Sequence, residues 1–433
     1  MDPSKFIDPN LTEPDLLVLK NLLQDGDRPS VEKTGPTRRG RNRGEKDTAP
    51  NGARQASADE TIQRLKALNN PQDSEFEPTV FVTWDTKDLS KHPLLNKWFL
   101  QPYMNLARKI VRVDTDVVML SHLLLYFATS VPSAIFLFYR FHWAHGIAHW
   151  IMQTYYVGTY TLMMHQHIHM GGILKKSFSW FDAVFPYITN PLMGHTWNSY
   201  YYHHVKHHHV EANGPDDLSS TIRYQRDEIV DFLCYVGRFF FFIWFELPLY
   251  FFRKGKRNLA LKAAFWEVGN YLVLYLLWNY VSWKPTLFVF MLPLLQLRVG
   301  LMVGNWGQHA LVDEVDPNSD FRSSITLIDV ASNRFCYNDG YHTSHHLNPL
   351  RHWREHPVSL LQQKDRYAAE HALVFRNIDY IMITVRLLRK DYHHLAKCLV
   401  PMGDQVGMTL DEIAEMLQRK TRRFSEDEVR DKF

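Results

Sequence analysis

The chain concentrates its histidines in three short clusters, at residues 165–169, 203–209 and 342–346. These 17 positions hold 11 of the 23 histidines, whereas an even distribution would place about one histidine there. Imidazole is a good neutral ligand for iron, copper, nickel and zinc. The clustering therefore predicts that the protein binds metal through histidine nitrogens.

Histidines three or four positions apart on a helix project from one face, and each cluster contains such a set. The candidate metal-binding residues are His165, His169, His204, His207, His208, His209, Asn305, His309, His342, His345 and His346. The second cluster allows two registers, which share His204 and His208. The third ligand is His207 in the HxxHH register and His209 in the HxxxHH register. Either register gives nine imidazoles, more than the four ligands of one structural zinc, and two metal ions are expected.

Other histidines fit this pattern less well. On a helix, His167 points away from its two neighbours in the first cluster, so it is left out. His145 and His149 form a rival pair with the same spacing, but they lie ~24 Å along a helix from the first cluster. His352 and His356 lack partners at the right spacing, and a structural role is expected for both.

Acidic and thiol residues add little to the predicted ligand set. Asp216 and Asp217 follow the second cluster, where they could orient imidazoles or be ordinary loop acids. The three cysteines form no CxxC motif, which argues against a disulfide scaffold and a thiolate site. The sequence contains no Glu-x-x-His motif, so it does not match carboxylate di-iron bundles.

The clusters lie at or beyond the ends of long apolar segments. The mean hydropathy of -0.29 averages two polar ends with an apolar, aromatic middle. Five segments are each long enough to cross, or nearly cross, a hydrocarbon core of ~30 Å. They span residues 117–139, 141–164, 229–252, 261–283 and 286–304. The fold class expected from this pattern is an all-α integral membrane protein.

The number of membrane crossings follows from the position of the ligands. All ligands must lie on one membrane face, so an even number of crossings must separate the second cluster from Asn305. The basic stretch 253–257 is expected on the cytoplasmic side. We therefore expect segment 229–252 to lie in the interface or to dip into the membrane and return, and the other four segments to be transmembrane helices. Both termini and a histidine-rich cap then face the cytoplasm.

The remaining chain suggests three regions. Residues 1–100 are expected to be polar and largely disordered, with one amphipathic helix at 11–24. The disordered part is expected at 24–59. Its basic run, 38–43, is expected to be solvated rather than bound to lipid. Residues 101–400 form the membrane domain, and 401–433 a helical tail with two capping boxes. The start of the chain lacks a signal-peptide pattern. The charges of the 49 basic and 46 acidic residues nearly cancel, so the net charge does not indicate nucleic-acid binding.

In chain order, the three clusters and the Asn305 motif resemble the histidine boxes of the membrane fatty acid desaturase and hydroxylase superfamily. The resemblance covers residues 117–357. It implies two Fe ions held by histidine, with Asn305 reaching iron through water. It also implies O2 as co-substrate and the removal of hydrogen from an unactivated C–H bond of a lipid or fatty acyl chain.

The resemblance favours a desaturase, with hydroxylation as the alternative because the box pattern does not separate the two. Electrons are expected from an external donor, cytochrome b5 or a ferredoxin, since no His-Pro-Gly-Gly haem motif is present. An endoplasmic reticulum membrane is expected if the source is eukaryotic. A zinc-dependent hydrolase would leave six of the nine histidines without a role. A metal transporter would place its ligands within the spans.

Overall fold

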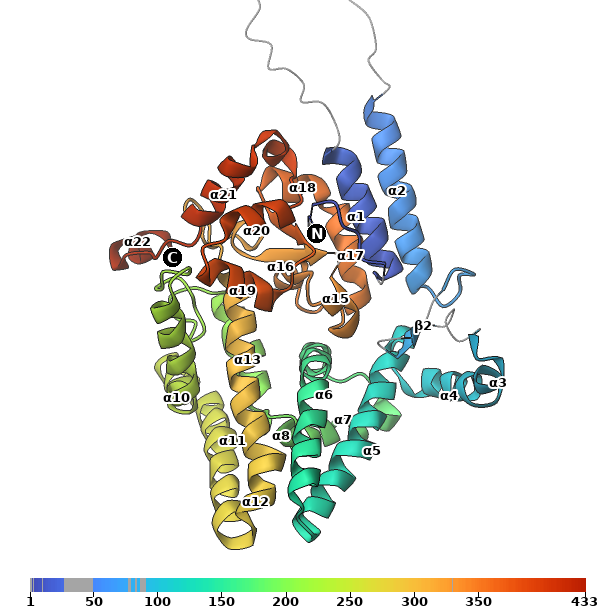
Figure 1. Ribbon diagram of the computed structural model, residues 1–433, viewed down its shortest axis with the longest axis vertical. Coiled ribbons are helices and arrows are strands. Elements are labelled where there is room, and N and C mark those ends of the chain that lie inside the picture. The colour runs from blue at the N-terminus through green and yellow to red at the C-terminus, as the bar shows by residue number, and fades with distance from the viewer. Residues whose placement is uncertain are drawn as a thin grey trace, which may run out of the picture.

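The computed structural model describes residues 2, 4–9, 11–26, 50–76, 79–81, 84–85, 91–328 and 330–433. The basic run 38–43 lies outside these residues. As predicted, the protein is mostly helical (70%), and the described part adds two short two-stranded sheets. Long helices form a bundle, and shorter helices form a cap over one end of it (Figure 1).

Two helical hairpins form the bundle. The first consists of α5 (Val117–Tyr139) and α6 (Trp143–Met170), joined by residues 140–142. The second runs down α11 (Arg257–Leu276) and η7 (Leu277–Val281), and returns through α12 (Trp283–Thr286), η8 (Leu287–Met291) and α13 (Leu292–His309). Helices α6 and α13 lie side by side (Figure 1), so their histidine-bearing ends meet below the cap.

Three helical segments within the described residues are long and apolar enough to cross a membrane: Asp114–Tyr139, Ile229–Arg253 and Trp283–His309. This set differs from the predicted one. It includes α10 (Ile229–Arg253), which was expected in the interface, and omits α6 and α11, which were expected to span. Both omitted helices carry buried polar side chains, such as Gln153 on α6 and Glu267 on α11. These residues lower the average apolarity of the helix although they face the protein.

Both ends of α10 reach the level of the histidine clusters. Near its start, the Tyr235 hydroxyl lies 2.6 Å from the Asn305 amide nitrogen of α13. Near its end, the Tyr250 hydroxyl donates to Glu211 (2.5 Å), and Lys254 pairs with Asp216 (2.8 Å). Between these contacts, one face of the helix is buried and the other is exposed and aromatic.

Short helices precede the first hairpin and connect it to α10. Before α5 lie α3 (Pro93–Leu95), η2 (Asn96–Leu100), α4 (Gln101–Ile110) and η3 (Asp114–Asp116). Between α6 and α10 lie η4 (Lys176–Phe178), α7 (Ser179–Asp182), η5 (Phe185–Thr189), α8 (Asn190–Leu192), η6 (Tyr201–His208) and α9 (His209–Glu211). The last three segments return the chain from within the bundle to the cap.

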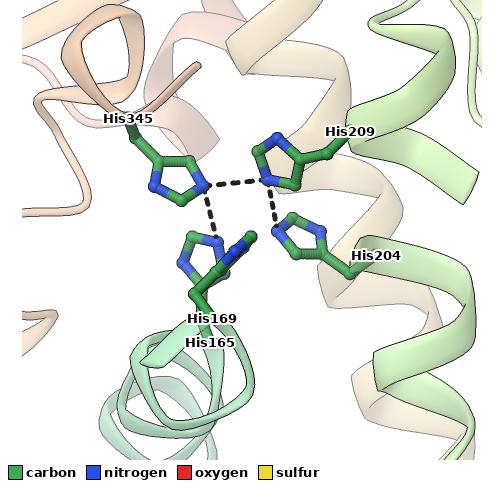
Figure 2. A group of neighbouring side chains, drawn as sticks. All are labelled: His165, His169, His204, His209 and His345. Atoms are coloured by element: carbon green, nitrogen blue, oxygen red, sulfur yellow. Dashed lines mark hydrogen bonds between the residues drawn. The ribbon is translucent and has the colours of Figure 1, made fainter. Parts of the chain in front are cut away.

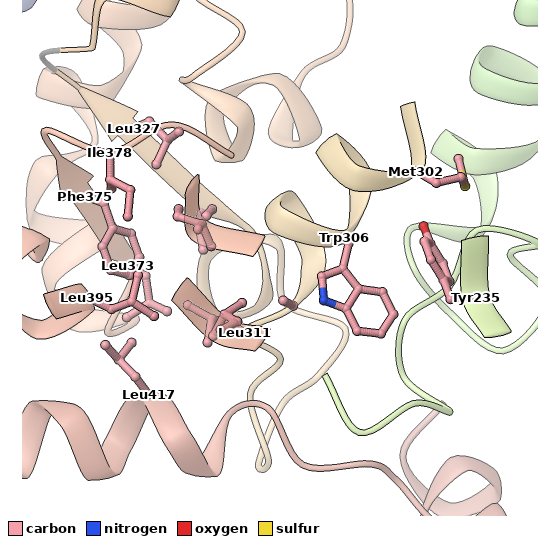
Figure 3. Packing of buried hydrophobic residues seen from close by; sticks show 14 of the residues in the cluster. Tyr235, Met302, Trp306, Leu311, Leu327, Leu373, Phe375, Ile378, Leu395 and Leu417 are labelled. Carbon is pink, nitrogen blue, oxygen red and sulfur yellow. The ribbon is translucent and has the colours of Figure 1, made fainter. Parts of the chain in front are cut away.

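The cap is built on a parallel strand pair, β3 (Ile325–Ile328) and β4 (Leu373–Arg376). Its helices are α14 (Asp320–Ser323), α15 (Ala331–Phe335), α16 (His342–Leu347), η9 (Trp353–Glu355), α17 (His356–Gln362), α18 (Lys364–Ala369), α19 (Tyr380–Leu388), α20 (Tyr392–Cys398) and η10 (Gly403–Gly407). One continuous core joins the cap to the bundle, from Leu327 and Phe375 on the strands to Trp306 on α13 (Figure 3). Burying this much apolar surface fixes the position of the cap relative to the end of α13.

The C-terminal tail contains α21 (Leu410–Arg419) and α22 (Glu426–Lys432). Each begins with a capping box, in which a side-chain oxygen and a glutamate satisfy backbone N–H groups at the helix start. These boxes involve Thr409 with Glu412 and Ser425 with Glu428. Both boxes were predicted from the sequence, and the structure confirms them.

The N-terminal region contains more structure than predicted. Helix α1 (Glu13–Gly26) confirms the expected amphipathic helix, but α2 (Pro50–Asn69) begins inside the segment predicted to be disordered. A short antiparallel pair, β1 (Thr79–Phe81) and β2 (Trp84–Asp85), follows. Leu19 of α1 and Leu65 of α2 are buried in a core shared with α17 of the cap. Local composition did not predict α2, because the α17 residues against which it packs lie some 300 residues away in the sequence.

Helix α1 also places a buried carboxyl group behind the third histidine cluster. Asp15 accepts a hydrogen bond from the Tyr341 hydroxyl (2.6 Å) and is completely buried. Burial raises the pKa of Asp15 to about 6, and hydrogen bonds from Tyr341 and Thr12 oppose that shift. The folded state therefore holds this proton more tightly than the unfolded state. Its contribution to stability is present at low pH and is lost as the pH rises through about 6.

Replacing this carboxyl group should stabilise the protein at neutral pH. Asp15→Asn keeps an acceptor for Tyr341 but removes the desolvated charge, and should raise the free energy of unfolding by up to about 3 kcal/mol at pH 7.5. The gain should shrink at pH 4.5, where Asp15 is largely protonated in the folded state. Melting curves in detergent at both pH values measure it, with exposed Asp365→Asn as the control. A less stable Asp15→Asn protein at pH 7.5 would contradict the prediction.

Candidate metal centre

The three clusters and His309 meet where the bundle joins the cap. They come from the end of α6, from η6 and α9, from the end of α13 and from α16. The π-helical turn η6 determines the register of the second cluster. Its wider turn, with i→i+5 hydrogen bonds, brings residues four and five positions apart onto one face. His204, His208 and His209 therefore face the site, in the HxxxHH register.

The first group contains five histidines whose ring nitrogens lie within 4.8 Å of one another: His165, His169, His204, His209 and His345. The Nε2 atom of His345 lies 3.0 Å from that of His165 and 2.9 Å from that of His209 (Figure 2). Two nitrogens bound at right angles to one metal, each ~2.1 Å away, are separated by ~3 Å. The spacing of this group therefore fits a shared metal ion.

The second group contains His208, His309 and His346, whose ring nitrogens also lie within 4.8 Å of one another. His342 adjoins it, because its Nε2 atom lies 3.1 Å from that of His309. The rings of His209 and His346 have centroids 5.1 Å apart, so the two groups are neighbours. With His342 included, the second group holds four histidines, and their spacing fits a second metal ion.

The protonation of these histidines favours metal binding. Burial, followed by the proximity of other histidines, lowers the pKa of His204, His209, His342 and His345 well below the ordinary value. A neutral imidazole carries one N–H and one lone pair. The buried Nε2 atoms of His169 and His346 have no hydrogen-bond partner among the described residues. A cation would satisfy these lone pairs and offset the repulsion between nitrogens only 3 Å apart.

Carboxylates lie behind three of these histidines. Asp217 Oδ2 lies 2.8 Å from His208 Nδ1, in the position that one of the two open interpretations predicted. Such a contact holds the proton on Nδ1 and leaves Nε2 free for a metal. Two further carboxylates were not predicted. Asp339 lies 3.4 Å from His165 Nδ1, and Asp320 lies 3.4 Å from His346 Nδ1.

Two predicted site residues lie outside both groups. His207 Nε2 accepts a hydrogen bond from the backbone N–H of Leu218 (3.1 Å), and its ring packs against Tyr250. Asn305 lies one turn before His309, and its amide nitrogen donates to the backbone carbonyl of Ser219 (3.0 Å). Asp216, the other acid after the second cluster, pairs with Lys254 instead of a histidine.

The histidines left out of the ligand set have other partners. His167 Nε2 lies 3.1 Å from Asp182, on the side of α6 away from both groups. The rival pair His145 and His149 contacts the Ser133 hydroxyl within the first hairpin. His352 bonds to Asp116 and His356 to Ser344. All five side chains have structural partners.

Two matched substitutions test the register of the second cluster. Glutamine places an amide near the position of Nε2 but is a poor iron ligand, so His209→Gln should lose at least half of the bound metal. His207→Gln should retain it, because its amide oxygen can still accept from Leu218. Elemental analysis of the two purified variants gives the comparison. Metal loss in His207→Gln with normal content in His209→Gln would support the HxxHH register instead.

A family model described as fatty acid desaturase matches residues 141–358, which is 218 of the 433 residues. The matched range contains every histidine of both groups. Searches of curated proteins and of solved structures gave no significant match. The chain therefore belongs to the fatty acid desaturase family, whose members are membrane-associated, lipid-modifying oxidoreductases of the desaturase and hydroxylase type.

Proposed function

We propose that this protein is an oxygen-dependent di-iron enzyme that introduces a double bond into a fatty acyl chain. The observation that carries the proposal is the convergence of nine histidines into two adjacent groups at the end of an apolar helical bundle. Two iron ions, when bound, would supply the activation of O2 needed to take hydrogen from an unactivated C–H bond. The family match supports the lipid substrate.

The residues divide between the two ions by their grouping. His165, His169, His204, His209 and His345 would hold one iron, and His208, His309, His342 and His346 the other. Asp217 would orient His208 by accepting its Nδ1 proton. Asp339 and Asp320, each 3.4 Å from an Nδ1 atom, would act on His165 and His346 through their charge. Asn305, one turn before His309, would act on the second iron only through water. His207 would act on Leu218 and Tyr250 and not on a metal.

The surroundings of the two groups suit an apolar substrate and a polar electron donor. An acyl chain could approach from the apolar bundle, while the polar cap lies on the other side (Figure 1). Buried ligands such as His309 and His345 are 2% and 3% exposed, so bulk water is largely excluded. The donor would be a separate protein, cytochrome b5 or a ferredoxin, docked on the cap.

Hydroxylation is the second candidate, because the same centre serves both outcomes in the family. A hydrolase is disfavoured because the second group of histidines would have no task. A transporter is disfavoured because its ligands should lie near the middle of the spans, whereas these groups lie at the helix ends.

For the membrane topology, we propose four spans, made by α5, α6, α11 with η7, and α12 to α13. The contacts at both ends of α10, and that of Phe240 in its middle with Arg298, support a helix that lies in the interface or dips into the membrane and returns, although its composition alone would allow it to cross. The basic turn after α10 would then be cytoplasmic, as would the metal centre and both termini. In a eukaryotic cell the endoplasmic reticulum membrane is the expected location.

Lipid profiling tests the reaction. Cells expressing the protein should accumulate acyl chains two mass units lighter than the precursor, and the products should disappear in His345→Ala. His167→Ala, which changes a buried histidine outside both groups, serves as the matched control and should retain activity. Products one oxygen heavier would indicate the hydroxylase. An unchanged lipid profile in cells with well-expressed, iron-loaded protein would contradict both candidates.

Glycosylation tags test the topology. A tag at Lys284, in the turn between α11 and α13, should be modified because it lies in the lumen. A tag after Gly255, in the basic turn between α10 and α11, should remain unmodified. The reverse pattern would mean that α10 crosses the membrane and that the number of crossings between the second cluster and Asn305 is not even.

A further inference from the structure

An ion pair lies inside the bundle, away from the histidines. Glu267 of α11 and Arg298 of α13 are 3.0 Å apart, and the residues are 3% and 7% exposed. Glu267 is ~15 Å along α11 from the basic turn, and Arg298 is ~16 Å along α13 before His309. Both distances are about half of a ~30 Å hydrocarbon core. Ionisable residues at such depth are costly and mark functional positions.

The pair holds a turn that leads to the second cluster. Glu267 Oε1 accepts hydrogen bonds from the hydroxyls of Thr196 (2.7 Å) and Ser199 (2.5 Å). Arg298 donates to Glu267 and to the backbone carbonyl of Phe240 on α10 (3.4 Å). One carboxylate thus links the turn to α11 and α13, and the guanidinium extends the link to α10.

The turn, residues 193–200, is irregular at 193–198, becomes helical at 199–200 and packs inside the bundle. Gly194 has a φ of 90°, and a Cβ atom there would lie 2.3 Å from the backbone oxygen of Pro293 on α13. Asn198 also has a positive φ, of 51°. Irregular backbone is tolerated at membrane depth only where protein groups satisfy it or where it lines a cavity. Glu267 holds this turn through two of its side-chain hydroxyls, those of Thr196 and Ser199.

The turn lies next to the first group of histidines. It ends at Tyr200, whose ring centroid is 5.3 Å from that of His204. Tyr200 in turn packs against His195, at 4.9 Å. A displacement of the turn would therefore move both a proposed ligand and the surface next to it on the bundle side.

We propose that Glu267 and Arg298 are positioning residues that set where along the acyl chain the enzyme acts. This inference rests on the proposed function. By fixing residues 193–200, the pair holds His204 and the Tyr200 surface at a constant distance from the reacting carbon. An apolar pair of similar volume can match a buried ion pair in stability. It cannot accept the two hydroxyl hydrogen bonds that orient the turn.

The test uses the full-length protein with two readouts, the position of the new functional group in the product and the visible spectrum of the cobalt(II)-loaded protein. Glu267→Gln and Thr196→Val, which removes a hydroxyl without changing volume, should both shift the product position and the spectrum. Turnover should fall on the order of tenfold to a hundredfold. Thr196→Ser, which keeps the hydroxyl, should resemble the wild type. So should Glu246→Gln, which breaks the partly exposed Arg238–Glu246 pair on α10.

Wild-type product position and cobalt spectrum in both Glu267→Gln and Thr196→Val would overturn the inference, even if the variants melt at lower temperature. If Glu267→Gln does not fold, Thr196→Val alone decides. If the wild-type protein yields no oxidised lipid, the proposed function fails, and the cobalt spectra still show whether the pair positions the histidines.

Discussion

The architecture depends on bringing neutral imidazole nitrogens to within about 3 Å of one another inside the protein. Uncharged lone pairs at that distance repel, and a cation between them turns the repulsion into binding. Four separate segments must end at one place to achieve this: the ends of α6 and α13, the η6 turn and α16. The apolar core from Trp306 to Phe375 fixes the cap on the bundle, and a hydrogen bond between Asp217 and His208 orients one of the rings.

The sequence pattern was enough to predict the apolar segments that form α5 and most of α6, the histidines at or beyond the ends of apolar segments, and the position of His167 away from its two neighbours. It could not choose between His207 and His209, because helical spacing was assumed to be that of an α-helix. The π-helical turn η6 changes which residues share a face. Asp339 and Asp320 were also missed. Both precede the third cluster, Asp320 as the first residue of α14 and Asp339 in a turn, and only the folded cap brings them to His165 and His346.

The membrane helices show a related limit. Apolarity averaged along a helix favours α10 as a membrane span and disfavours α6 and α11. Both ends of α10, however, contact residues that lie close to the histidine clusters in the sequence. The polar residues responsible, including Gln153 and Glu267, face other helices and not lipid. Likewise, the N-terminal helix α2 is polar in composition and was not predicted. It packs through Leu65 against residues of α17, which lie far along the chain. The positions of these helices are determined by long-range packing, which local sequence patterns do not predict.

The proposed reaction requires that the nine grouped histidines hold two iron ions. Elemental analysis of the protein, purified from membranes of iron-replete cells without added metal, tests it most directly. We expect about two irons per chain and little zinc, because two adjacent all-nitrogen groups are available. One zinc per chain with negligible iron would contradict it and would favour a single-metal hydrolase.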